Sequence, residues 1–167
     1  MIKIIAAIGK NNELGKNNSL PLWRLLTDFK RFKELTTSGT VVMGRKTFES
    51  LPEKFRPLPN RKNIVITRDS NFNSDQTFDI IVEPNLESAI NHLQNEQEVF
   101  IIGGGEIYKQ SLHLIDTIYK TSVNTTIEGD VYFSEIDPNQ FELVWEEKHL
   151  ADEKNKMDYT FQKYIKR

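Results

Sequence analysis

Short runs of β-branched and apolar residues recur along the chain and are separated by amphipathic or polar stretches. The runs contain few polar residues, which is typical of strands buried on both faces of a sheet. They lie at 2–8, 40–43, 63–67, 79–82, 99–102 and 116–123. The stretches between them predict helices at 25–36, 45–51, 86–95 and 105–112. This alternation predicts an α/β fold with a mostly parallel central sheet flanked by helices on both faces.

The end of the chain has a different pattern. The strand-like segments ELVWEEKHL (142–150) and MDYTFQKYI (157–165) flank a polar stretch, ADEKNK. A short polar connection between two strands predicts a hairpin, so we expect antiparallel strands at that edge of the sheet. No repeat, low-complexity run or Pro/Gly/Ser linker divides the chain, and we interpret 1–167 as a single domain.

Composition narrows the class of protein. With 38% hydrophobic and 28% charged residues, the chain has the balance of an ordinary globular protein. The net charge of −2 argues against a nucleic-acid partner. There are no cysteines, which excludes disulfides and thiolate chemistry. The first apolar run, 4–8, is too short for a signal peptide, and no run approaches the ~20 residues that span a bilayer, so we expect a cytoplasmic protein without membrane contact.

Positive charge is concentrated in one part of the chain. Residues 45–68 contain seven Lys or Arg and two Glu, a net charge of +5, which leaves −7 for the rest. We expect this segment to bind anions. Arg68 ends a predicted strand there; a lone arginine at such a place is usually only solvated, but it could also contact a phosphate.

Two predicted strands run into glycine and then into a helix, in VVMGRKTFES (41–50) and VFIIGGGEIYKQ (99–110). Such a corner directs backbone N–H groups and the positive end of a helix dipole at one point, which suits a phosphate. One corner alone could be an ordinary turn. Two corners in one parallel sheet favour a ligand, because ligands bind at the carboxyl ends of the strands. The second corner differs from the common dinucleotide pattern, since Tyr108 stands where the third glycine would be.

Asp28 is the other candidate for chemistry. In a helix it shares a face with Phe32 and Leu35, which would turn its carboxylate toward the core. It could be a helix cap or a first-turn acid, or a buried carboxylate that hydrogen-bonds an N–H-rich ligand ring. The three histidines lack metal-ligand spacing, so we expect no metal. No serine lies in a nucleophile elbow, so we expect no covalent catalysis either. The chemistry that remains is the transfer of a proton or a hydride, guided by charged side chains.

Taken together, these segments resemble dihydrofolate reductase. The colinear motifs are IIAAI, ELGKNNSLP, WRLLTDFKRF, VVMGRKTFESL, RPLPNRKNIVITR, IIGGGEIY and EGD. The resemblance implies a mostly parallel sheet of about eight strands. It also implies NADPH-dependent reduction of 7,8-dihydrofolate to tetrahydrofolate, with hydride transfer to C6 and protonation of N5. The resemblance therefore implies an oxidoreductase of one-carbon metabolism that supplies tetrahydrofolate and is a target of antifolates.

The resemblance also assigns roles to individual residues. Asp28 would hydrogen-bond the pterin ring and promote N5 protonation, Thr121 would steady its carboxylate, and the Trp23 indole would order a water near the proton path. Arg61 would bind the glutamate-tail carboxylate as a fork. The remaining residues of the substrate pocket would be Ile5, Leu20, Phe29, Phe32, Leu51, Arg56, Leu58, Ile102 and Tyr108.

For NADPH, the resemblance assigns the two glycine corners, the end of one strand and a loop that closes over the nicotinamide. Arg68 would contact the 2′-phosphate, and the first two glycines of the triplet would be joined by a cis peptide. The cofactor residues would be Ala7, Leu14, Gly15, Lys16, Asn17, Asn18, Gly44, Arg45, Lys46, Thr47, Thr67, Arg68, Gly103, Gly104, Gly105, Glu106, Ile107 and Tyr108.

The chain departs from the family pattern at two places. Leu22 separates Pro21 from Trp23, which changes the loop over the nicotinamide, and Asn60 replaces a common glycine, where asparagine tolerates a left-handed backbone. Two other functions stay open. One is reduction of another pterin-like or flavin-precursor ring, and the other is a nucleotide-binding module without turnover. A monomer is expected, since no apolar stripe demands a partner.

Overall fold

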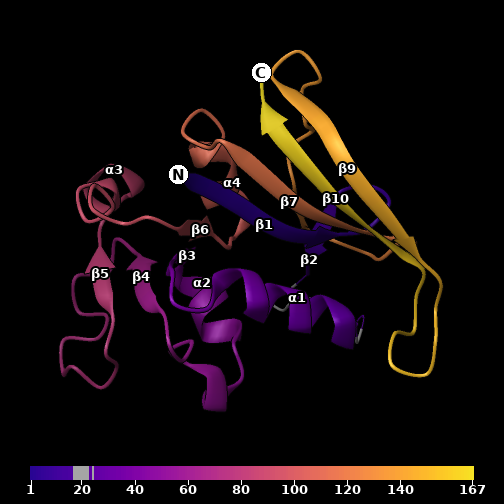
Figure 1. Ribbon diagram of the computed structural model, residues 1–167. Coiled ribbons are helices and arrows are strands. Elements are labelled where there is room, and N and C mark those ends of the chain that lie inside the picture. The colour runs from indigo at the N-terminus through magenta and orange to yellow at the C-terminus, as the bar shows by residue number, and fades with distance from the viewer. Residues whose placement is uncertain (17–22, 24) are drawn as a thin grey trace.

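The computed structural model describes residues 1–16, 23 and 25–167. Its main feature is an eight-stranded sheet in the order β5-β4-β3-β6-β1-β7-β10-β9 (Figure 1). The strands are β1 (Ile2–Ile8), β3 (Thr40–Gly44), β4 (Lys62–Ile66), β5 (Ile81–Glu83), β6 (Val99–Ile101), β7 (Thr117–Val123), β9 (Phe141–His149) and β10 (Tyr159–Lys166).

The pairing of the strands agrees with the two patterns in the sequence. Every pair from β5 across to β7 is parallel, whereas β10 pairs antiparallel with β7 and with β9. The predicted fold class and the antiparallel edge are therefore confirmed. The fully apolar runs became the central parallel strands because both of their faces are covered.

The helices are α1 (Leu26–Thr36), α2 (Arg45–Ser50), α3 (Leu86–Ile90) and α4 (Gly105–Ser111), with a 3-10 turn at Glu53–Phe55. The predicted helix 86–95 was too long. Asn91 and His92 donate their backbone N–H groups to residues three positions earlier, so the α-helix tightens into turns after Ile90. The other predicted helices agree with the structure to within one residue at each end.

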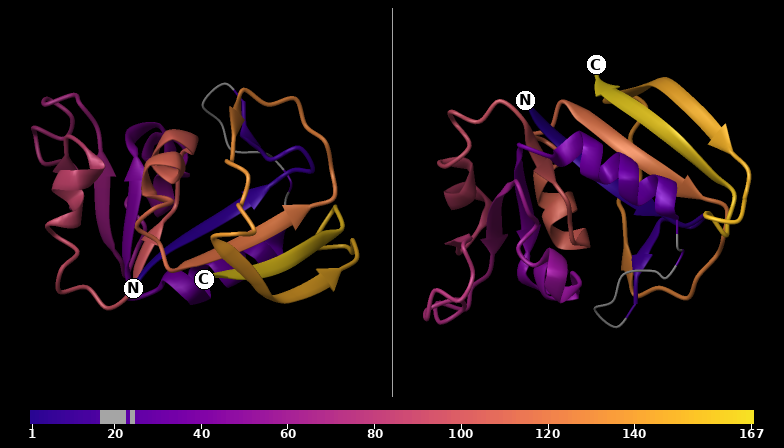
Figure 2. Two further views of the ribbon diagram at one scale, coloured as in Figure 1. Left: turned by 90° about the horizontal axis from the view of Figure 1, so that it is seen from above. Right: turned by 60° about the horizontal axis from the view of Figure 1, so that its bottom comes forward.

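Helices cover both faces of the sheet (Figure 2), and a hydrophobic cluster lies under the helices of each face. Val41, Met43 and Val65 point to the face covered by α1 and α2, where they meet Phe48. Val42 and Ile64, one position along each strand, point to the face covered by α3 and α4. This alternation along single strands makes the layered architecture and exposes the carboxyl ends of the strands at one rim.

A second, two-stranded sheet was not predicted. It pairs β2 (Glu13–Gly15) with β8 (Val131–Tyr132), which are too short to show a pattern in the sequence. The small sheet lies against the second glycine corner, since a Cβ on Gly105 would come within 2.7 Å of Val131. It therefore brings Leu14 and Gly15 to the rim where the predicted cofactor residues gather.

Candidate active site

Asp28 is the third residue of α1, and its side chain points to the sheet. Thr121 on β7 donates a 2.6 Å hydrogen bond to the Asp28 carboxylate, and among the described residues this is its one hydrogen bond. Burial raises the pKa of Asp28, while the Thr121 bond and the positive charge of Arg31 act in the opposite direction. Of the two interpretations of this residue, the structure favours the partly buried carboxylate, although Asp28 also lies in the first turn of the helix.

The start of α1 is held by a residue that the sequence did not reveal. Leu25 occupies the N-cap and gives no side-chain cap. Instead, Asn155, from the hairpin between β9 and β10, accepts a 3.0 Å bond from the Thr27 backbone N–H and donates a 2.9 Å bond to its hydroxyl. Asn155 is almost fully buried, at 2% exposure. Nothing in the sequence pattern predicts that Asn155 caps this distant helix. Its two hydrogen bonds fix the start of the helix that carries Asp28.

The predicted apolar pocket residues gather beside Asp28. Those that share one cluster under α1 and α2 are Ile5, Phe32, Leu51, Leu58 and Ile102. Phe29 is different, because its ring is 61% exposed, so it can contact a ligand at the rim of the pocket but adds little to the wall. Leu20 lies outside the described residues. The Tyr108 hydroxyl donates to the Ile5 carbonyl at 2.8 Å, and burial followed by the nearby Asp28 charge raises the pKa of Tyr108.

Arg61 is half-buried beside this pocket. Its guanidinium lies 5.6 Å from the centre of the Phe32 ring, and its buried Nε has no hydrogen-bond partner among the described residues. Burial lowers the pKa of Arg61. Asn60 before it has a φ of 57°, so the expected left-handed backbone is present. Arg56 instead donates two bonds to the Leu51 carbonyl, at 3.2 and 2.7 Å, and so supports the wall.

The two glycine corners meet at the rim of the sheet. The Gly44 N–H donates a 2.8 Å bond to the Gly103 carbonyl, and a Cβ on Gly104 would lie 3.4 Å from the Thr47 hydroxyl. The expected cis peptide joins Gly103 to Gly104. Gly103 has a φ of 120°, which excludes larger side chains. A Cβ on Gly103 or Gly105 would meet Tyr108 or Val131, at 3.3 and 2.7 Å, so packing within the protein favours glycine at both positions. Ile107 is buried behind the corners and Glu106 is exposed.

The predicted cations stand at the same rim. Register pairs Gly44 with Ile66, so Arg45 and Lys46 lie beside Thr67 and Arg68 at the ends of neighbouring strands. Lys46 and Arg68 are exposed. Arg45 is engaged with two carboxylates, through Nε to Glu49 at 2.8 Å and through Nη1 to Asp69 at 2.6 Å. Neither pairing was predicted.

The loop segment is described only in part. Ala7 on β1 lies opposite Thr121, and Lys16 pairs with Glu128. The buried Trp23 belongs to a hydrophobic cluster against which Ala7 packs, and its indole Nε1 has no hydrogen-bond partner among the described residues. An unpaired indole N–H suits the water predicted there. Asn17, Asn18, Pro21 and Leu22 lie outside the described residues.

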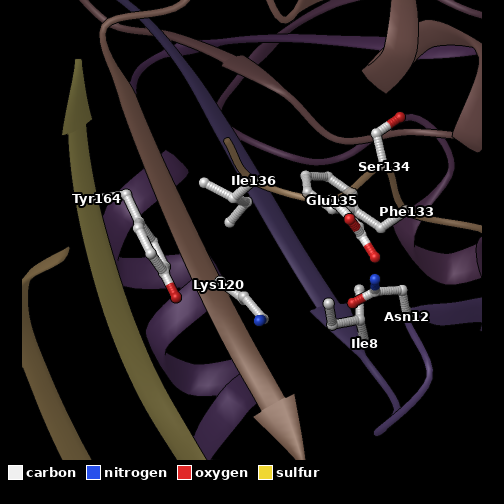
Figure 3. A pocket seen from close by; sticks show the side chains of 8 residues that line it. All are labelled: Ile8, Asn12, Lys120, Phe133, Ser134, Glu135, Ile136 and Tyr164. Carbon is white, nitrogen blue, oxygen red and sulfur yellow. The ribbon is translucent and has the colours of Figure 1, made fainter. Parts of the chain in front are cut away.

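A cavity of about 280 Å³ lies on the face of the sheet opposite α1 (Figure 3). Lys120 lines it, whereas Thr121 beside it on β7 points to Asp28 on the other face. Burial lowers the pKa of Lys120. The other lining residues are Ile8, Asn12, Phe133, Ser134, Glu135, Ile136 and Tyr164. None of the predicted site residues lines this cavity, so it is separate from the candidate active site.

Comparison with known proteins agrees with this arrangement. The sequence model of the family Dihydrofolate reductase matches residues 1–166. Dihydrofolate reductases of Bacillus subtilis and Haemophilus influenzae are 40% and 39% identical over 169 and 161 residues, covering 100% and 95% of this chain and 95% and 94% of theirs. A structure of the Enterococcus faecalis enzyme complexed with NADP(H) and RAB-propyl has a TM-score of 0.89 at 34% identity and covers 100% of this chain and 96% of that one. The chain belongs to the dihydrofolate reductase family.

Proposed function

We propose that this chain reduces 7,8-dihydrofolate to 5,6,7,8-tetrahydrofolate with NADPH as the hydride donor. The observation that carries the proposal is the Asp28 carboxylate, which lies beside an apolar pocket with Thr121 as its one hydrogen-bond partner among the described residues. Burying a carboxylate is costly unless it is paired, so this arrangement calls for an N–H-rich ligand. A pterin ring has that chemistry.

The cofactor fits the residues at the other side of the rim. The two glycine corners, at Gly44 and at 103–105, lead into helix N-termini that would face the dinucleotide, and Arg45 and Arg68 would face its phosphates. When bound, NADPH supplies the hydride that goes to C6 of the substrate. The relative from Enterococcus faecalis, whose fold this chain shares, is complexed with NADP(H), which supports this assignment.

The protein residues then orient the substrate and favour its protonation. Asp28 would accept hydrogen bonds from the pterin ring, and the ionised carboxylate would stabilise the protonated ring, so that N5 takes a proton through water. Thr121 holds the carboxylate in place with its 2.6 Å bond. Asp28 is thus an electrostatic and orienting catalyst, and the apolar wall excludes competing water.

Arg61 supports dihydrofolate over an acceptor ring without a tail. Its buried Nε lacks a partner among the described residues, and a half-buried guanidinium without a carboxylate is incompletely solvated. A glutamate-tail carboxylate would complete its hydrogen bonds with the fork geometry that arginine offers. A substrate without that carboxylate would leave Arg61 unpaired.

The test follows loss of NADPH absorbance with dihydrofolate across a range of pH for the wild type and Asp28→Asn. At neutral pH the variant should lose about 10²- to 10⁴-fold in rate. It should recover as pH falls, because the substrate is then protonated without help. Glu153→Gln removes one charge from the exposed hairpin and should match the wild type.

Two outcomes would contradict the proposal. If the wild type binds NADPH but never oxidises it with dihydrofolate, either the acceptor or turnover itself is wrong. If Asp28→Asn keeps the wild-type rate and pH profile, the carboxylate does not assist protonation.

Some finer assignments stay predictions. No described helix has the length and apolar character needed to cross a membrane. Cytoplasmic location and a monomeric state are proposed from the sequence, and sedimentation of the purified chain tests the latter.

A further inference from the structure

Arg45 lies at the rim of the proposed cofactor site and forms ion pairs with two carboxylates. Glu49, one turn further along α2, binds its Nε at 2.8 Å, and Asp69, just beyond β4, binds its Nη1 at 2.6 Å. Phe72 lies beneath the guanidinium, 5.0 Å from ring centre to Cζ. Two of the three nitrogens are therefore engaged by negative groups.

Asp69 is also held in place by its own turn. Its backbone N–H donates to the Thr67 hydroxyl at 3.1 Å, and its Oδ1 accepts the Asn71 N–H at 3.0 Å, which leaves Oδ2 to bind Arg45. Asp69 thus binds Arg45 at the end of β3 and directly follows Arg68 in the chain, beyond the neighbouring β4. An anion that binds both arginines must come close to it.

We infer that Asp69 is a specificity-determining residue that narrows the preference of this enzyme for NADPH over NADH. The inference rests on the proposed function, in which Arg68 would contact the adenosine 2′-phosphate and Arg45 would face the phosphates of the same cofactor from the neighbouring strand end. A phosphate dianion would be repelled by Asp69 and would compete with it for the Arg45 guanidinium. A free ribose 2′-hydroxyl could instead donate a hydrogen bond to the same carboxylate, as acidic residues do in dinucleotide sites.

The size of the effect is limited by exposure. The Arg45 and Asp69 side chains are 39% and 43% exposed, and an exposed pair of this kind has a small interaction free energy. The phosphate can therefore displace Asp69, and NADPH still binds. We expect a change in the ratio of the two affinities and no loss of either cofactor.

The experiment measures the dissociation constants of NADPH and NADH by calorimetry for the wild type, Asp69→Asn and Glu153→Gln. Asparagine can still accept the Asn71 N–H, so the turn is kept. For Asp69→Asn the dissociation constant of NADPH should fall about 1.5- to 5-fold, a range typical of one exposed charge, whereas that of NADH should stay the same or rise. Glu153→Gln has the same charge change far from the rim and should alter neither constant.

Salt gives an independent readout. In about 1 M salt, where the Debye length is roughly 3 Å, the advantage of Asp69→Asn for NADPH should shrink. An unchanged ratio of the two constants overturns the inference. A higher dissociation constant for NADPH overturns it too, since Asp69 would then serve only to orient Arg45.

Failure of the proposed function would look different. Binding is measured without turnover, so Asp69 can alter the cofactor ratio even in a chain that reduces another acceptor. Conversely, a wild type that turns over dihydrofolate while Asp69→Asn leaves the ratio unchanged contradicts only this inference.

Discussion

The substrate side and the cofactor side of the rim use charge in opposite ways. Beside the apolar pocket, α1 presents one carboxylate, Asp28, whose burial raises its pKa. At the cofactor side, the Arg45 side chain is 39% exposed and is shared between two carboxylates. The pKa of a buried group is set by loss of solvation and by its few neighbours, whereas the interaction energy of an exposed ion pair depends on the salt concentration. Substitutions on the two sides should therefore be distinguished by their pH and salt dependence.

The largest effect on stability is expected where the backbone of the cofactor side is most constrained. Gly103→Ala should lower the free energy of unfolding by about 1–3 kcal/mol, because Gly103 has a φ of 120°. Its new Cβ would also lie 3.3 Å from the Tyr108 ring. Urea unfolding measures this. The matched variant Gly104→Ala has an ordinary φ of −84° and should lose much less stability; equal losses would contradict the argument.

On the substrate side, Arg61→Lys tests whether the half-buried guanidinium binds the substrate carboxylate through two parallel hydrogen bonds. The KM for dihydrofolate should rise about 10- to 100-fold, since lysine keeps the charge but cannot make two parallel bonds. Steady-state kinetics with NADPH saturating measure it. Lys54→Met, an exposed cation of the same basic segment, should leave that KM unchanged. Conversely, a normal KM in Arg61→Lys would remove Arg61 from the substrate site.

The buried carboxylate should also cost stability, which separates it from the exposed pairs. The pKa of Asp28 is raised by folding, so its ionised form destabilises the fold above that pKa, and the penalty vanishes as pH falls below its ordinary value of 3.8. Asp28→Asn should therefore be more stable at pH 7, by about 1 kcal/mol, a common size for single substitutions. Urea unfolding of both proteins at pH 7 and below pH 3.8 checks this prediction. If Asp28→Asn were still more stable than the wild type in acid, the prediction would be contradicted.

The smallest effect concerns Arg31, which shares α1 with Asp28. Its guanidinium lies 4.1 Å from the centre of the Phe161 ring and 5.2 Å from that of Trp145, and its charge lowers the pKa of Asp28. Arg31→Met removes this charge, so the pKa of Asp28 should rise and the acidic limb of the pH profile of kcat/KM should move to higher pH. Lys30→Met is the control, because the Lys30 side chain is 75% exposed and pairs with Glu34. Equal shifts in both variants would indicate net charge alone.

Comparing sequence and structure, the layered fold was well determined by local pattern. Unbroken apolar runs specify strands buried on both faces, and a polar connection specifies the final hairpin. Where these signals were weak, prediction failed. The pattern predicts helix at 91–95, where the chain forms turns, and β2 and β8 are too short to show any periodicity.

The sequence by itself also determined which chemical groups are available. It placed Asp28 on an apolar helix face, glycines after two strands and arginines in one basic segment. These are local facts, because each depends on residues within a few positions of one another.

Only the tertiary structure decided how those groups are paired. Thr121 reaches Asp28 across 93 positions of sequence, and Asn155 holds the start of α1 across 128. Asp69 likewise meets Arg45 only because β3 and β4 lie side by side. Hydrogen bonds and ion pairs act over a few ångströms in space, and side-chain types along the chain do not record which distant segments the sheet brings within that range.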